Sequence, residues 1–122
     1  MKILIVGAGR IGISAAESLV SEANDITVVD TDEAHIQYLQ AQFDLRGVVG
    51  SATSPEVLRE AGAEDTDMLI AVTSNDETNL AVSLLAARLF NIPTRIARVR
   101  NQELLGYPRI LGEEGFGATA VI

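Results

Sequence analysis

Residues 3–12, Ile-Leu-Ile-Val-Gly-Ala-Gly-Arg-Ile-Gly, form an apolar strand pattern that runs directly into glycines at positions 7, 9 and 12. A helical stretch follows, and a second apolar run, residues 26–29, ends on Asp30, 18 residues after Gly12. A GxGxxG pattern alone is a weak signal, because glycines fall at this spacing by chance in many loops. Here it lies between a strand and a helix, and an acid ends the next strand, which is the context of a dinucleotide-binding fingerprint.

Each part of this pattern has a physical role in holding a dinucleotide. Gly7 permits the tight turn out of the strand, Gly9 lets the backbone approach a pyrophosphate, and Gly12 lets the helix pack against the sheet. We expect the first-turn amides of the helix to face the phosphates, and Asp30 to accept hydrogen bonds from the ribose hydroxyls of adenosine. The competing interpretation is a glycine turn in an ordinary strand–helix–strand unit, with Asp30 capping the next helix.

Composition limits the class of protein. The chain of 122 residues and 13.0 kDa has the size of one domain with a single core. Its net charge of −8 and its pI near 4.5 leave no basic stripe, so nucleic acid and anionic membrane surfaces are not expected partners. The sequence contains no cysteine, which excludes disulfides, thiolate metal sites and cysteine nucleophiles.

Strand and helix patterns alternate along the chain, which is typical of a parallel sheet with crossover helices. Strands are expected at residues 3–6, 26–29, 48–49, 68–72, 95–99 and 118–122. Helices are expected after Gly9, at residues 32–43, 56–61 and 102–105, and between the loop 73–77 and about residue 90. The sequence therefore predicts an α/β fold: one Rossmann-type domain with a doubly wound, parallel, six-stranded sheet. Because the chain stops on its last expected strand, we expect residues 1–122 to be the N-terminal part of a longer chain.

In such a sheet the ligand lies over the carboxyl ends of the strands. Four loops, all small, polar or containing glycine, are expected to line the site: residues 7–12, 30–32, 50–53 and 73–76. We expect Ala52 and Thr53 beside the adenine, and Thr73 and Ser74 near the pyrophosphate or the second ribose. Ordinary strand–helix turns favour the same residue types, so both interpretations stay open for each of these residues.

Charged side chains outside the fingerprint give weaker signals. Arg10, inside the glycine loop, is placed either to contact phosphate oxygens or to lie in solvent. Arg98 and Arg100 share one face of the fifth strand, and we assign Arg98 to the site and Arg100 to an ion pair. His35, the only histidine, is expected on the solvated face of its helix, and Glu113–Glu114 is interpreted as solvated charge. No metal-ligand or catalytic spacing is present, which indicates a binding module rather than an enzyme.

Five stretches of the sequence together resemble one family: MKILIVGAG (1–9), NDITVVDT (24–31), VLREAGA (57–63), AVTSNDETN (71–79) and RIAR (95–98). The family is the nucleotide-binding domain of bacterial Trk-type potassium-uptake regulators, also called the regulator-of-K⁺-conductance (RCK) domain. The resemblance covers residues 1 to about 100 and is weak beyond residue 101. Ser51 departs from the pattern, since many relatives carry an acid there that contacts the adenine side.

The resemblance implies a regulatory protein that binds NAD⁺ or NADH, or ATP or ADP at the same site. It implies a cytoplasmic homo-oligomer, peripheral to the inner face of the cell membrane, that gates a membrane potassium transporter or channel by a nucleotide-dependent change of shape. By position, it implies these nucleotide contacts: Gly7, Gly9, Arg10, Ile11, Gly12, Asp30, Thr31, Ser51, Ala52, Thr53, Thr73, Ser74, Asn75 and Arg98. The alternative function is the cofactor-binding domain of an NAD-dependent oxidoreductase, separated from its catalytic half.

The helix after the fourth strand is apolar on nearly every side. One face is enough to cover a sheet, so this helix is expected to have a second burial partner. A symmetric homodimer is one such partner. The other is the C-terminal segment of the same chain, folded over the helix.

Overall fold

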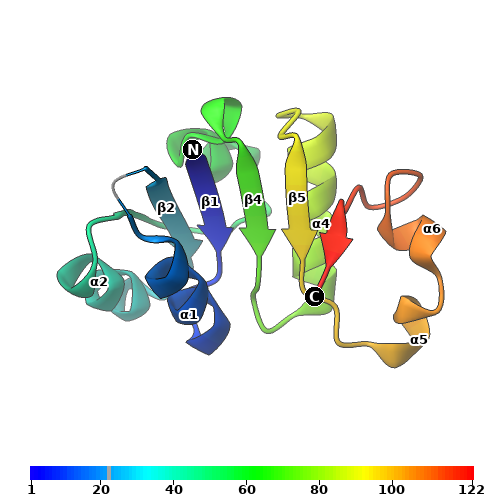
Figure 1. Cartoon of the computed structure of the whole chain (residues 1–122), viewed down its shortest axis with the longest axis horizontal. Helices are drawn as coiled ribbons and strands as arrows, with labels where there is room; N and C mark the ends of the chain where they lie inside the picture. The colour runs from blue at the N-terminus through cyan, green and yellow to red at the C-terminus, as the bar shows by residue number, and fades with distance from the viewer. Residues whose placement is uncertain (22) are drawn as a thin grey trace.

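The computed structural model, which describes residues 1–21 and 23–122, contains a six-stranded sheet in which every pairing is parallel (Figure 1). The strands are β1 (Lys2–Val6), β2 (Asp25–Asp30), β3 (Arg46–Val49), β4 (Met68–Ala71), β5 (Thr94–Ala97) and β6 (Ala120–Val121). Their order across the sheet is β3-β2-β1-β4-β5-β6. The chain builds outward from β1 in one direction and then outward from β4 in the other, so the switch point lies between β1 and β4. The predicted Rossmann-type sheet is confirmed.

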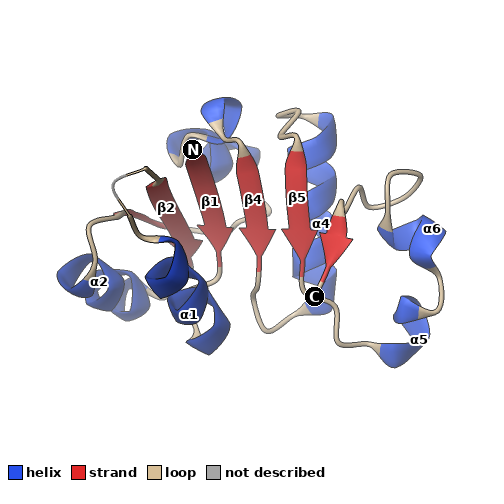
Figure 2. Cartoon of the chain, viewed as in Figure 1, coloured by secondary structure: helices blue, strands red, loops and turns tan. Residues whose placement is uncertain are grey.

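Helices cover both faces of the sheet. Figure 2 shows α1 (Arg10–Leu19) and α2 (Glu33–Gln42) on the near face, with α4 (Asp76–Arg88) behind β5. The short α3 (Pro55–Glu60) and the 3₁₀ turn η1 (Ala63–Asp65) pack on the same face as α4. Two further short helices, α5 (Gln102–Leu105) and α6 (Pro108–Leu111), lie beyond the β6 edge. Within the described residues, none of the helices combines the length and the apolar character that crossing a bilayer requires.

The central strand β1 contributes side chains to the core on both faces of the sheet. Ile3 and Ile5 pack with the α1 and α2 layer, whereas Leu4 and Val6 pack with the α3 and α4 layer. All four side chains are at most 2% exposed, because alternate residues of a strand point to opposite faces and both faces are covered. The strand that leads into the glycine loop is therefore buried on both of its faces.

Capping side chains determine where most of the helices begin. The helices α2, α3, α4 and α5 each start at a side chain that accepts backbone N–H bonds: Asp32, Ser54, Asn75 and Asn101. In contrast, α1 has Gly9 as its N-cap and no side-chain cap. The first-turn amides of α1 are thus left for solvent or for a ligand at the carboxyl edge of the sheet.

The C-terminal segment differs from the sequence prediction. Helix α6 was not expected, β6 is shorter than residues 118–122, and β5 ends at Ala97 rather than Val99. Helix α4 ends at Arg88, and Asn91 adopts a left-handed φ of 51°. β6 is an edge strand with β5 as its one neighbour, so only a short ladder supports it.

Arg95 explains how this segment is held, and it corrects one interpretation. Its buried guanidinium donates to the carbonyls of Gly117 and Ile92 and pairs with Glu113 at 2.5 Å. Glu113 is therefore not a free solvated charge, although its side chain is 72% exposed. A buried positive charge needs a partner, and the C-terminal loop supplies it.

The same segment covers part of α4. Leu80 packs against Val99 and Leu111, and a Cβ added at Gly117 would lie 2.9 Å from the Cβ of Ala87. The second burial partner on this side of α4 is thus the chain's own C-terminal segment. Leu89, just past the helix, is 51% exposed.

Candidate nucleotide-binding site

A cavity of about 890 Å³ lies over the carboxyl ends of the central strands. This volume falls within the range of small-molecule and cofactor pockets. The cavity is lined by the four predicted loops and by the end of β5. Of the 14 residues predicted as nucleotide contacts, 13 line it: Gly7, Gly9, Arg10, Ile11, Asp30, Thr31, Ser51, Ala52, Thr53, Thr73, Ser74, Asn75 and Arg98.

The three glycines of the fingerprint have different surroundings. Gly12 does not line the cavity, because it packs beneath the loop, where an added Cβ would lie 1.8 Å from the Gly7 carbonyl oxygen. Gly7 has a φ of +109°, and a Cβ there would lie 2.9 Å from the backbone nitrogen of Thr73. Gly9 has open space around its Cβ position, with no atom within 4 Å. Gly7 and Gly12 are thus required for packing, and Gly9 leaves room at the cavity surface.

The carboxylate of Asp30 joins three parts of the site. Its Oδ1 accepts a bond from the Ala8 amide at 2.9 Å, and its Oδ2 accepts one from the Asp32 amide at 2.9 Å. The side chain is 16% exposed. These bonds tie the end of β2 to the glycine loop and to the start of α2. Because each carboxylate oxygen has two lone pairs, Asp30 keeps capacity to accept bonds from a ligand.

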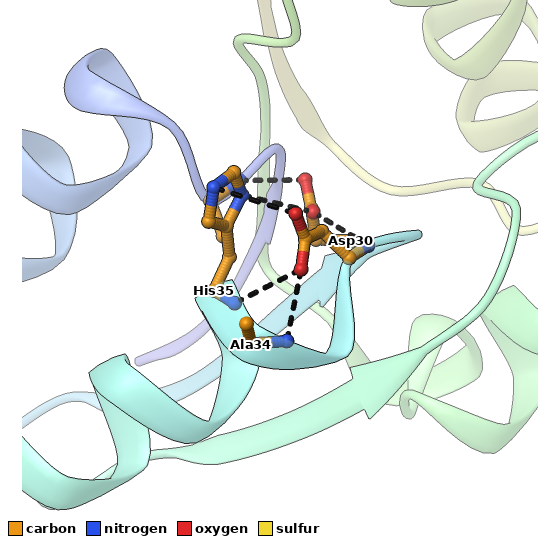
Figure 3. Close-up of polar contacts among 5 residues, drawn as sticks. Asp30, Ala34 and His35 are labelled. Atoms are coloured by element: carbon orange, nitrogen blue, oxygen red, sulfur yellow. Dashed lines mark hydrogen bonds and ion pairs between the residues drawn. The ribbon is translucent and has the colours of Figure 1, made fainter.

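His35 lies beside this carboxylate, as Figure 3 shows. Its Nδ1 is 3.4 Å from Oδ2 of Asp30, and its Nε2 is 3.6 Å from Oδ2 of Asp32, contacts that are ion pairs only when the imidazole is protonated. The side chain is half exposed, as the sequence predicted, but it also lines the cavity, which was not predicted. The available signal was its place in the first turn of a helix that begins directly after Asp30.

On the opposite side of the cavity, Asn79 connects the ends of β4 and β5. It is wholly buried in α4 and bonds to both Thr73 and Arg98. Asn79 was not predicted as a site residue, although a polar amide inside an otherwise apolar helix was a visible signal.

Charge is unevenly distributed along the cavity. Asp30 and Asp32 lie at the β2 end, Arg98 and Arg100 at the β5 end, and Arg10 in the glycine loop between them. Among the described residues, no acidic side chain lies within 4.0 Å of the Arg100 guanidinium. The assignment of Arg100 to an ion pair is therefore wrong. Its backbone amide instead donates to the Asp76 carboxylate. The arrangement suits a ligand with hydroxyls at one end and phosphates further along.

The strand order, the glycine loop and the acid at the end of β2 define a Rossmann-type domain of the nucleotide-binding class. Residues 3–122 match the family model of the TrkA-N domain. The chain belongs to this family, and the resemblance drawn from the sequence is confirmed.

Two curated relatives carry the description "Trk system potassium uptake protein TrkA". The protein from Haemophilus influenzae is 55% identical over 105 residues, covering 86% of this chain and 23% of the relative. The protein from Vibrio alginolyticus is 51% identical over 115 residues, covering 94% of this chain and 25% of the relative. The chain therefore spans about a quarter of the length of these relatives.

Solved structures share the fold. The TrkA-N domain of the inner membrane protein ybaL from Escherichia coli superposes with a TM-score of 0.84 at 24% identity, over 99% of this chain and 85% of that one. The GsuK channel bound to NAD gives a TM-score of 0.74 at 27% identity, over 99% and 21%. GsuK bound to ADP gives 0.77 at 28% identity, over 99% and 30%.

Proposed function

We propose that residues 1–122 form the NAD(H)-binding regulatory domain of a bacterial Trk-type potassium-uptake system. Nucleotide binding changes the shape of a homo-oligomer on the cytoplasmic face of the membrane and so gates a potassium transporter. The observation that carries the proposal is the bond between Asp30 and the Ala8 amide, which holds the ribose-binding acid and the glycine loop together at one cavity.

The geometry supports a definite placement of the nucleotide. The adenosine ribose binds Asp30, and the adenine lies beside Ala52 and Thr53. The pyrophosphate lies over Gly9 and the uncapped first turn of α1, where backbone amides and the helix dipole favour an anion. Arg10 is in the same loop and adds a charged donor.

The relatives support the regulatory part of the proposal. Their names place them in potassium uptake, and the GsuK channel, with a domain of the same fold, binds NAD and ADP. The rival function, the cofactor domain of an oxidoreductase, requires a substrate site with a hydride acceptor beside the nicotinamide. The relatives give that rival no support.

The proposal is tested by calorimetric titration of the chain with NAD⁺, NADH, ATP and ADP. Saturable binding of NAD⁺ or NADH at one site per chain is expected. A parallel measurement of potassium uptake compares cells carrying the wild-type gene with cells carrying Asp30→Asn. Failure of all four nucleotides to bind at millimolar concentration, or unchanged uptake despite lost binding, overturns the proposal.

A further inference from the structure

The side-chain amide of Asn79, in the wall behind the cavity, makes all of its hydrogen bonds to the protein. Its side chain is 0% exposed. Its Oδ1 accepts from the Thr73 amide at 2.9 Å and from the Thr73 hydroxyl at 2.7 Å. Its Nδ2 donates to the carbonyl oxygens of Thr73 at 3.1 Å and Arg98 at 3.0 Å. Two donors face the oxygen and two acceptors face the nitrogen, so the amide has only one orientation.

This orientation determines what Thr73 offers to a ligand. Its amide hydrogen and its hydroxyl hydrogen both point to Asn79. The other acceptor within reach of the hydroxyl, the Asn75 carbonyl at 3.1 Å, also belongs to the protein. The hydroxyl oxygen accepts one bond, from the Asn75 amide at 3.2 Å, and retains a second lone pair. Thr73 lines the cavity, so it presents an acceptor there and no donor.

The strand order places Thr73 relative to the rest of the nucleotide. Asp30 ends β2, the glycine loop follows β1 and Thr73 follows β4, in that order across the sheet. Neighbouring strands are about 4.8 Å apart, so the β2 and β4 ends are separated by roughly 10 Å. With the adenosine ribose at Asp30 and the pyrophosphate over the glycine loop, the next group of the ligand lies at Thr73.

That next group differs between the candidate ligands. ADP has none, and ATP has a terminal phosphate, whose oxygens at neutral pH are acceptors. NAD(H) and ADP-ribose have a second ribose, whose hydroxyls donate. Two acceptors that face each other without a shared hydrogen disfavour binding, whereas a hydroxyl donor satisfies the free lone pair of Thr73.

We propose that Thr73, oriented by Asn79, is a specificity-determining residue that favours ligands with a second ribose over ATP. This inference rests on the proposed nucleotide site. Arg98 and Arg100 attract the phosphates of all these ligands by charge, and those of ATP most strongly, so Thr73 acts against the preference that charge alone would give.

The test is Thr73→Val, which keeps the shape of the side chain and the backbone bond to Asn79 but removes the hydroxyl. Calorimetry with ADP-ribose, NADH, ADP and ATP is performed on the wild type and the variant, with folding checked by thermal unfolding. Affinity for ADP-ribose and NADH is expected to fall about two- to tenfold, the loss of one neutral hydrogen bond. Affinity for ADP stays within about twofold, affinity for ATP does not fall, and Thr73→Ser restores the wild-type pattern.

Thr53→Val is the matched control, because Thr53 lies on the adenine side that all four ligands share. It is expected to change their affinities by the same factor. Thr73→Ala provides the same comparison if the valine variant is unfolded. An equal effect of the Thr73 variants on all four ligands, or no effect on any, refutes the specificity role. Absence of binding to the wild type instead refutes the proposed function itself.

Discussion

Replacing Asp30 with Asn removes the charge that the proposed ribose contact requires and preserves the shape of the side chain. The carboxylate accepts bonds from the Ala8 and Asp32 amides, both at 2.9 Å. In the variant an amide NH₂ faces one of these two donors, so one bond is lost and a ligand hydroxyl meets a weaker acceptor. A hydrogen bond to a charged group contributes about 1.5–3 kcal/mol. The dissociation constant for NAD(H) is therefore expected to rise by a factor of about ten to over a hundred. Asp30→Ala is expected to raise this dissociation constant as well.

Asp32→Asn is the matched control. It removes the same charge two residues away, from a side chain that is 50% exposed. Asparagine is as good an N-cap as aspartate, so α2 keeps its start. Since exposed charges contribute at most about 1 kcal/mol, the affinity of this variant is expected to stay within about fivefold of wild type.

The assay is calorimetric titration with NADH at fixed pH and ionic strength, after thermal unfolding shows that each variant is folded at the assay temperature. Equal affinity of the wild type and Asp30→Asn would refute the ribose assignment. Equal weakening by Asp30→Asn and Asp32→Asn would show that only the local charge matters, and not hydrogen bonds from the carboxylate of Asp30.

Four further outcomes are expected. Gly12→Ala should strongly destabilise the fold, because its Cβ would lie 1.8 Å from a backbone oxygen, whereas Gly9→Ala should keep the melting temperature and weaken nucleotide binding. Equal melting temperatures would contradict this. NAD(H) should bind more tightly than NADP(H), since a 2′-phosphate meets the Asp30 carboxylate, and comparable affinities at moderate salt would show that this carboxylate points elsewhere. The chain should consume no NADH with small carbonyl compounds, and sustained consumption abolished by a cavity mutation would overturn that expectation. The chain should self-associate through a surface that includes the C-terminal end of α4, where Leu89 is exposed, and light scattering that finds a strict 13 kDa monomer at several hundred micromolar, with and without NADH, would rule it out.

Local sequence was enough to predict most of the fold and much of the cavity lining. The apolar run of β1, the glycine loop and the alternation of strand and helix patterns each depend on a few neighbouring residues, so they can be interpreted without knowledge of distant contacts. Because parallel strands place their carboxyl ends at one edge, the predicted loops had to meet once the fold class was known.

The tertiary structure alone decided the contacts that depend on which distant segments become neighbours. Asn79 reaches Arg98, 19 residues along the chain, and Arg95 is neutralised by Glu113, 18 residues along. The C-terminal segment reaches α4 only because β6 pairs with β5 at the sheet edge. No short-range pattern encodes these pairs, since a hydrogen bond or a packed contact between remote residues exists only after the sheet order has brought their backbones together.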